Sequence, residues 1–339
     1  MTEAGPLASL KILVTGGAGY IGSFIVRHLL RAGARPVVVD NLYSGHRWAV
    51  GDAELVVGSV GDTKLMEPLL AERHFNAVIH CAAHIWVSES VADPGKYYRN
   101  NTGNAATLFD LCAKAGVRTV VFSSTAAVYG APGIPLLPET TPTLPINPYG
   151  ASKLMSERIL MDIAGAHGLN YGILRYFNVA GADAEAAIGE ATPDNVHLVK
   201  VACETAMGKR RGMHINGTDY PTPDGSCIRD YVHVDDLATA HLAALRHLRD
   251  GGESFIANCG YGHGFSVREV LESARRITGV DFPISEGPRR AGDPPELVAD
   301  SRRAKELLGW QPRHDDLDYI IATAWRFEQR LREDTSLRD

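Results

Sequence analysis

Tyr149 and Lys153 are the two residues whose types and spacing point most directly to catalysis. They lie four positions apart in YGASK, at the start of a predicted helix, so their side chains project from one face in successive turns. An ammonium group beside a phenol favours the phenolate, and we expect it to lower the tyrosine pKa towards neutrality. A phenol with such a pKa can act as a general acid or base.

A cluster of hydroxyl side chains stands upstream of this pair. The predicted strand Thr119–Phe122 is followed directly by Ser123, Ser124 and Thr125. Open α/β sheets bind their ligands at the carboxyl ends of the strands, where these hydroxyls should lie. Together with the tyrosine and lysine, they predict a site that holds a hydroxyl group while it is oxidised.

Three glycines predict a dinucleotide site. Gly16, Gly19 and Gly22 in TGGAGYIG lie between a predicted strand and helix, where a tight turn lets a pyrophosphate approach the helix N-terminus. The next predicted strand ends at Asp40, 18 residues after Gly22, where a carboxylate can accept from both ribose hydroxyls. The same carboxylate would repel a ribose phosphate, so the sequence favours NAD over NADP.

The elements that must position these residues form an α/β pattern. Short apolar runs alternate with helical stretches such as Tyr20–Ala32, and continuous apolar runs are typical of strands covered on both faces. We therefore predict a doubly wound parallel sheet of the Rossmann type. The predicted strands are Lys11–Thr15, Pro36–Val39, Glu54–Val57, Ala77–Cys81, Thr119–Phe122 and Gly172–Leu174.

A smaller C-terminal substrate domain is expected after Asn178, where the rhythm changes. We assign residues 8–178 to the dinucleotide-binding domain and 179–339 to a discontinuous second domain, with a return to the first domain near 229–255. Helices are expected near Val196–Met207, Val234–Leu248, Val267–Thr278 and Arg302–Leu308.

Composition excludes several classes of protein. The 339 residues carry 34 Lys and Arg against 40 Asp and Glu, a net charge of −6 that gives no reason to expect nucleic acid or an anionic membrane as partner. Five scattered cysteines without a C-x-x-C pair argue against a disulfide framework, and histidine spacing predicts no metal site. With no signal peptide or membrane span in view, we expect a cytoplasmic enzyme acting on a small molecule.

Longer motifs make the family recognisable. From Lys11 to about Trp325 the chain resembles the UDP-glucose (UDP-galactose) 4-epimerases of the extended short-chain dehydrogenase/reductase superfamily. The matching segments are TGGAGYIG, ESVADPGKYYRNN, SSTAAVYG, YGASK, LRYFNVAGA, GTDYPTPDGSCIRDYVHVDDLA and RRAGDPPELVAD.

The resemblance implies tightly held NAD, a UDP-sugar substrate and a catalytic triad of Thr125, Tyr149 and Lys153. It also implies a homodimer that pairs the helices at Tyr97–Ala115 and Ser152–Gly165. The NAD-binding residues it implies are Gly16, Gly19, Tyr20, Ile21, Gly22, Asp40, Asn41, Ser59, Val60, Cys81, Ala82, Ala83, Asn100, Ser123, Tyr149, Lys153 and Tyr176. The substrate-binding residues are Thr125, Asn178, His197, Leu198, Asn216, Arg229, Arg290, Asp293 and Leu297. Arg290 and Asp293 could instead form a surface ion pair, and Asn178 could cap a turn.

Four positions depart from the family pattern. Ser59 stands in place of an aspartate that reads the adenine amino group, and Ile85 in place of a lysine near the diphosphate and nicotinamide. Asn216 replaces an aromatic residue that lies against uracil. At Leu297 a family tyrosine goes with unsubstituted hexoses, so the shorter leucine predicts at least partial acceptance of UDP-N-acetylhexosamines unless it simply packs in the core.

The function expected from this resemblance is reversible inversion at carbon 4 of a UDP-hexose through a transient 4-keto sugar. Other UDP-sugars, with a pentose or a uronic acid, remain open as substrates. A nucleotide-sugar 4,6-dehydratase is the main rival reaction, but those relatives carry an Asp-Glu pair where this chain has Ala126 and Ala127. A non-catalytic NAD sensor is the rival from another class.

Overall fold

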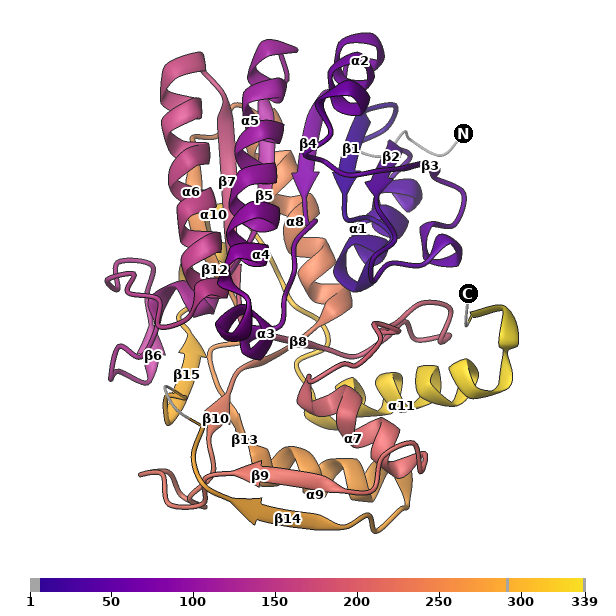
Figure 1. Cartoon of the computed structure of the whole chain (residues 1–339), viewed down its shortest axis with the longest axis vertical. Helices are drawn as coiled ribbons and strands as arrows, with labels where there is room; N and C mark the ends of the chain where they lie inside the picture. Colours follow the sequence, from indigo (N-terminus) through magenta and orange to yellow (C-terminus); the bar gives the residue numbers. More distant parts are fainter. Residues whose placement is uncertain (1–6, 291–292, 338–339) are drawn as a thin grey trace.

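A seven-stranded parallel sheet is the centre of the larger, upper part of the molecule in Figure 1. The computed structural model describes residues 7–290 and 293–337. The strand order is β12-β7-β5-β4-β1-β2-β3. Their bounds are β1 (Lys11–Thr15), β2 (Arg35–Asp40), β3 (Glu54–Val57), β4 (Ala77–His80), β5 (Thr119–Thr125), β7 (Asn170–Tyr176) and β12 (Phe255–Cys259).

Helices cover both faces of this sheet. Successive strand residues point to opposite sides, so each strand packs against both helical layers. In β1, Ile12 and Val14 pack with α1 (Tyr20–Arg31) and α8 (Val234–Arg249), whereas Leu13 packs with the helices of the other face. Those helices are α2 (Thr63–Arg73), α5 (Asn104–Lys114) and α6 (Pro148–His167). The predicted doubly wound parallel sheet is confirmed.

Two strands run further than the sequence predicted. β5 continues through the hydroxyl cluster to Thr125, and β7 continues to Tyr176, in register with it. The apolar run ends at Phe122, but the ladder of backbone hydrogen bonds does not depend on side-chain polarity. The hydroxyls that were expected just beyond the strand are therefore held in it and buried.

The return of the chain to the larger part also extends beyond the expected segment. α8 packs against α1, and β12 then pairs with β7 in parallel, so the chain stays in the larger part up to Cys259. The short strands β8 (Asn178–Ala180) and β11 (Tyr231–His233) pair where the chain leaves and re-enters it.

The smaller, lower part is built from helices and short sheets (Figure 1). The helix α11 was not predicted from the sequence; α7 and α9 lie where helices were expected. Its elements are α7 (Leu198–Ala206), β9 (Met213–Asn216), β10 (Ile228–Arg229), β13 (Phe265–Ser266), α9 (Val267–Thr278), β14 (Ile284–Gly287), β15 (Glu296–Ala299) and α11 (Leu317–Glu333).

Shorter elements lie between the long helices and strands or after the last helix. Of these, β6 pairs with β15, and α10 packs against α8 and β12. They are η1 (Arg47–Val50), α3 (Val87–Ala92), α4 (Pro94–Tyr97), η2 (Tyr98–Gly103), η3 (Ala126–Tyr129), β6 (Leu136–Leu137), α10 (Arg302–Leu308) and η4 (Thr335–Leu337). No helix within residues 7–290 and 293–337 combines the length and apolar character needed to cross a bilayer.

A buried ion pair fixes α6 against the sheet. Glu157 of α6 accepts from Arg175 of β7 at 2.6 and 3.0 Å, and both side chains are almost fully buried. Ser124 of β5 donates to the same carboxylate. Arg175 also donates to the Tyr129 hydroxyl at 3.1 Å, which in turn donates to Asn258 of β12 at 2.7 Å. This network joins α6, β5, β7, η3 and β12.

We predict that Arg175→Met lowers the free energy of unfolding by about 3–5 kcal/mol, because it leaves the Glu157 carboxylate buried without its cation. The double variant Arg175→Met/Glu157→Gln should lose less than Arg175→Met alone. Denaturant titration measures all three.

The matched control is Arg158→Met. Arg158 directly follows Glu157 in α6. Arg158 pairs with Asp162 at 3.0 Å on the surface, and we expect that variant to change stability by less than about 1 kcal/mol. Equal losses in Arg158→Met and Arg175→Met would contradict the role assigned to the buried pair.

Candidate active site

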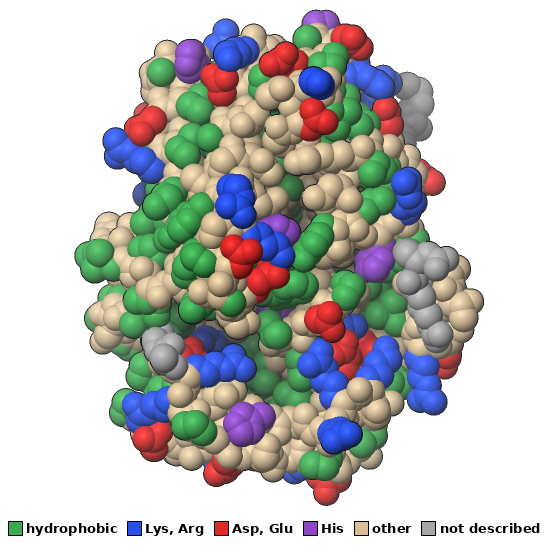
Figure 2. All heavy atoms as spheres, in the orientation of Figure 1, with side chains coloured by type: hydrophobic (Ala, Val, Ile, Leu, Met, Phe, Trp, Pro, Cys, Tyr) green, Lys and Arg blue, Asp and Glu red, His purple; other side chains and the backbone are tan. Residues whose placement is uncertain are grey.

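One cavity of 550 Å³ runs along the carboxyl ends of the strands and reaches the smaller part. Figure 2 shows this face hollowed between the upper and lower parts, with Lys and Arg side chains along the lower rim of the hollow. All the residues predicted to bind the cofactor line it: Gly16, Gly19, Tyr20, Ile21, Gly22, Asp40, Asn41, Ser59, Val60, Cys81, Ala82, Ala83, Asn100, Ser123, Tyr149, Lys153 and Tyr176.

Most residues predicted to bind the substrate line the same cavity. These are Thr125, Asn178, His197, Leu198, Arg290, Asp293 and Leu297. Asn216 and Arg229 lie outside its lining but contact residues that belong to it. The structure therefore brings together residues from about position 16 to position 297 of the chain.

The glycine loop at one end of the cavity cannot carry side chains. A Cβ on Gly22 would lie 2.1 Å from the Gly16 carbonyl oxygen, and one on Gly16 would lie 2.6 Å from the amide nitrogen of Ala82. Gly16 also has a φ of +71°, which favours glycine. Gly19 is the N-cap of α1 and offers no side chain to cap it, so the first amides of the helix remain free to bind an anion.

Asp40 at the end of β2 is buried, and its contacts are with backbone amides rather than with cations. Its carboxylate accepts from the amides of Ala18 at 3.0 Å and Leu42 at 2.8 Å. Burial raises the pKa of this carboxyl, and the two amide bonds oppose the rise. A buried carboxylate with spare lone pairs suits hydroxyl donors such as those of a ribose, so these residues fit NAD.

Ser59 lies beside Val60 in the same wall, and its hydroxyl accepts from the amide of Gly61 at 3.2 Å. It offers the cavity an uncharged oxygen.

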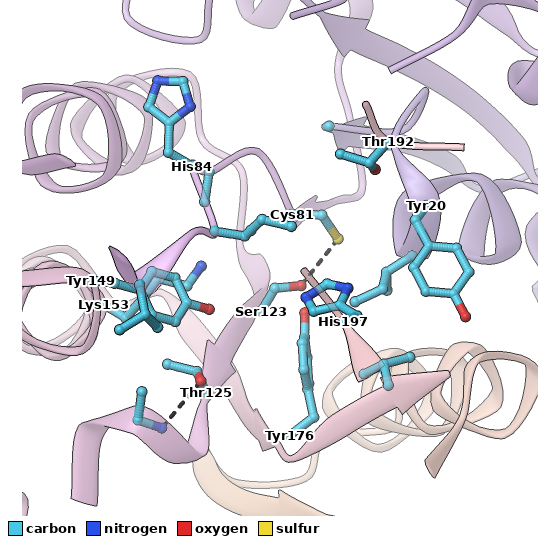
Figure 3. A pocket seen from close by; sticks show the side chains of 18 of the residues that line it. Tyr20, Cys81, His84, Ser123, Thr125, Tyr149, Lys153, Tyr176, Thr192 and His197 are labelled. Carbon is cyan, nitrogen blue, oxygen red and sulfur yellow. Dashed lines mark hydrogen bonds between the residues drawn. The ribbon is translucent and has the colours of Figure 1, made fainter. Parts of the chain in front are cut away.

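Close packing at the start of α6 positions Tyr149 and Lys153. Asn147 caps the helix by accepting from the amide of Gly150 at 2.8 Å, and Pro148 occupies the first turn. A Cβ on Gly150 would lie 2.5 Å from the carbonyl oxygen of Ala127, so the helix start touches η3 directly. Figure 3 shows the Tyr149 ring facing the cavity beside Thr125, with the Lys153 ammonium behind it. The hydroxyl of Thr125 lies next to that of Tyr149 in Figure 3 and accepts from the amide of Ala127 at 3.2 Å.

The expectation of a lowered tyrosine pKa is wrong for this structure. Burial raises the pKa of Tyr149, and the hydrogen bond with Thr125 opposes the rise only in part. Burial also lowers the pKa of Lys153 to about 8, so the ammonium itself is disfavoured. Lys153 stands over the ring of Phe122, 4.6 Å from its centroid. Desolvation is the largest cause of both shifts in pKa.

At the other end of the cavity, the predicted nucleotide-binding residues bond to one another. Arg229 forms an ion pair with Asp293 and donates to the carbonyl oxygen of Ile228 at 2.7 Å. The ion-pair partner of the Asp293 side chain is therefore Arg229 and not Arg290. Arg290 donates to the side-chain oxygen of Asn216 at 3.1 Å once that amide is oriented to satisfy both groups.

Sequence reasoning missed several cavity residues, including Phe177 and Glu190. Phe177 directly follows β7, so the rule that found the hydroxyls after Phe122 could have found it. Glu190 lies in the irregular segment between β8 and α7, where no periodicity or motif marks it. Its partner there is His197, at 2.5 Å.

Comparisons with known proteins agree with this geometry. The model of the NAD dependent epimerase/dehydratase family matches residues 12–260. A UDP-glucose 4-epimerase from Azospirillum brasilense is 53% identical over 327 residues, covering 96% of this chain and 94% of that protein.

Solved structures match over the same length. UDP-glucose 4-epimerase from Brucella ovis in complex with NAD superposes with a TM-score of 0.92 at 44% identity, covering 94% of this chain and 99% of that one. The UDP-Glc/GlcNAc 4-epimerase from Campylobacter jejuni gives a TM-score of 0.85 at 46% identity, covering 95% and 100%. The chain therefore belongs to the NAD dependent epimerase/dehydratase family.

Proposed function

We propose that this protein is an NAD-dependent isomerase that inverts carbon 4 of a UDP-hexose, and that its one large cavity holds both the NAD and the nucleotide sugar. The observation that carries this function is that Thr125 and Tyr149 line one cavity together with the glycine loop and Asp293. The larger part, 8–178 with its return segment, holds the cofactor, and the second domain, 179–339, holds the nucleotide end of the substrate.

Proton transfer is assigned to Tyr149. Its phenolate takes the proton from the 4-hydroxyl, while Thr125 orients the same oxygen and Lys153 stabilises the tyrosine in its charged form. NAD, when bound, accepts the hydride from carbon 4 and returns it to the opposite face of the sugar, so no net redox change occurs.

The nucleotide end retains the substrate while the keto sugar turns over. Asn178, Arg229, Arg290 and Asp293 contact the nucleotide, so binding energy far from carbon 4 keeps the intermediate in the cavity. Arginine suits a diphosphate because its planar guanidinium can bind two oxygens at once. Because Arg229 is already bound to Asp293, its contact with a phosphate requires that ion pair to open or to be shared.

A 4,6-dehydratase would need residues that this cavity does not offer beside Thr125. Elimination of water across carbons 5 and 6 needs an acid and a base beside the threonine, and the two residues that follow Thr125 in the cavity are Ala126 and Ala127. A turnover assay on UDP-galactose separates the epimerase from a non-catalytic NAD sensor.

Assembly and location are inferred from fewer observations. A homodimer that pairs the helical segments Tyr97–Ala115 and Ser152–Gly165 with those of a second copy would cover exposed apolar side chains such as Tyr98 (36%) and Met155 (47%). Five unpaired cysteines suit a reducing compartment, which supports a cytoplasmic location.

We predict that Tyr149→Phe abolishes epimerisation but leaves the fold and the NAD content intact, because it removes the titrating hydroxyl and little volume. The expected loss of kcat is on the order of 100- to 10,000-fold. Circular dichroism and NAD released on denaturation are the controls. Activity within about threefold of the wild type would remove Tyr149 from the mechanism.

The purified protein should carry NAD and convert UDP-galactose without added nicotinamide. Ser59 contributes no charge to the adenine side, so we expect incomplete occupancy and a higher retained fraction in Ser59→Asp. Chromatography of released nucleotide measures occupancy. Consumption of one NAD for each product formed would instead identify a net dehydrogenase.

Leu297 governs substrate breadth in our proposal. Its side chain both lines the cavity and packs against a small core cluster that includes Phe177 and Leu137. The smaller leucine leaves room beside carbon 2 of the sugar, so the enzyme should accept UDP-N-acetylhexosamines at least in part. The Leu297→Tyr variant should lose UDP-N-acetylgalactosamine selectively, by roughly 1–3 kcal/mol in kcat/KM.

The assay compares wild type and Leu297→Tyr on UDP-galactose and UDP-N-acetylgalactosamine. Equal losses on both substrates would show that tyrosine only damages the packing around Phe177. Absence of wild-type activity on the N-acetylated sugar would refute the proposal directly.

A further inference from the structure

The buried carboxylate of Glu190 is a strongly bonded group of the cavity wall to which the proposed mechanism assigns no role. It lies 2.5 Å from Nδ1 of His197, and its side chain is 8% exposed against 41% for the histidine. Both residues line the cavity. The carboxylate therefore sits behind the imidazole, whose other nitrogen is left to face a ligand.

A third residue fixes this pair. Asn195 donates from its amide to Glu190 at 2.7 Å and accepts from the backbone amide of His197 at 2.6 Å. Arg210 in turn donates to the carbonyl oxygen of Asn195 at 2.7 Å. The orientation of the imidazole is thus set by hydrogen bonds that run from Arg210 through Asn195 to Glu190 and His197.

His197 also stands at the positive end of a helix. It is the N-cap of the nine-residue helix α7, which no side chain caps, and Leu198 and Val199 of its first turn line the cavity. The N-termini of α1, at the glycine loop, and of α6, which the side chain of Asn147 caps, also line the cavity. Unlike the N-terminus of α1, that of α7 has beside it a side chain that can carry a positive charge.

Charged groups of the neighbouring helices are bound to one another. In α7, Lys200 pairs with Glu328 of α11 at 2.5 Å and with Glu204 at 3.7 Å. Glu204 also accepts from Arg210 at 2.6 Å, and Glu328 from Lys209 at 2.5 Å.

On the side of the larger part, α1 and β7 present tyrosines to the pair. Tyr20 donates its hydroxyl to the carbonyl oxygen of Gly181 at 2.6 Å, and burial raises the pKa of Tyr176. His46 also reaches this segment, where its ring contacts the carbonyl oxygen of Ala191 at 3.2 Å. Glu190 is the charge that raises the pKa of His197.

Titration follows from this arrangement. Burial disfavours the imidazolium, but the charge and hydrogen bond of Glu190 outweigh it and raise the pKa of His197. Burial likewise opposes the Glu190 anion, and His197 and Asn195 outweigh it and lower the pKa of that carboxyl. The histidine keeps its proton to a higher pH than an isolated imidazole and loses it as the pH rises further.

We propose that Glu190 is a positioning residue that keeps His197 protonated and directs it, together with the N-terminus of α7, at the diphosphate of the nucleotide sugar. The inference rests on the proposed function and adds a cation to it. The substrate diphosphate brings two negative charges, and Arg229, the more buried of the two arginines at that end, is neutralised by Asp293. The positive charge of His197 compensates for the charge of Arg229 that Asp293 neutralises.

The test compares Glu190→Gln with the wild type in steady-state kinetics on UDP-galactose. The variant keeps the shape of the pair and removes its charge, so KM should rise roughly ten-fold while kcat changes less than about two-fold. The inhibition constant of UDP should rise with KM, whereas that of uridine, which has no phosphate, should stay the same. As the pH rises above about 6.5, the ordinary pKa of an imidazole, KM of the wild type should increase, and the increase should begin at lower pH in the variant.

Two further variants keep the test decisive. His197→Arg supplies a fixed charge and should flatten the pH dependence of KM, even if Glu190→Gln fails to fold. Glu185→Gln, an exposed carboxylate of the same segment between β8 and α7 and outside the cavity lining, is the matched control and should leave KM unchanged.

Unchanged KM in Glu190→Gln, or equal loss of UDP and uridine binding, would overturn the assignment of Glu190. Either result would leave wild-type epimerisation in place, whereas failure of the proposed function would appear as absence of turnover in the wild type itself.

Discussion

The ion pair between Glu157 and Arg175 is the interaction on which the active-site geometry depends. Tyr149 and Lys153 come from α6, Thr125 from β5 and Tyr176 from the end of β7, so their mutual distances are fixed only if the helix and both strands keep one arrangement. Glu157 lies one turn after Lys153 and takes hydrogen bonds from both strands. Removing such charges from water is costly, so the pair forms only when the surrounding groups are placed correctly.

Burial has a second consequence, in the chemistry of the site. It pushes Tyr149 and Lys153 towards their neutral forms, which is the opposite of what their spacing alone suggests. The same exclusion of water strengthens every charge that enters the cavity, because the local dielectric is low. A charge that binds in the cavity therefore affects the protonation of Tyr149 and Lys153 more strongly than the bulk solvent does.

The sequence predicted those parts that local rules determine, and it missed those that depend on distant contacts. Glycine spacing, Asp40 at a strand end and the four-residue interval from Tyr149 to Lys153 each have a local physical meaning, and the structure places all of them in one cavity. The pairing of β12 with β7 depends on residues more than 80 positions apart, and no local pattern fixes it. The bonding of Arg229 to Asp293 depends equally on the fold, as does the direction of the Tyr149 pKa.

The two buried glutamates Glu157 and Glu190 have different roles. Glu157 joins α6 to the sheet, and Glu190 lies in the wall of the cavity. Glu157 is paired with an arginine, whose charge is permanent, and both side chains are almost fully buried between α6 and the sheet. Glu190 is paired with a histidine, which is a titratable residue, and this pair lines the cavity rather than the core. A permanent cation therefore fixes Tyr149 and Lys153 relative to the sheet, whereas a titratable residue stands in the wall of the cavity. Because the two pairs lie in different elements, the hydrogen bonds of Glu157 run to Arg175 and Ser124 and do not pass through His197.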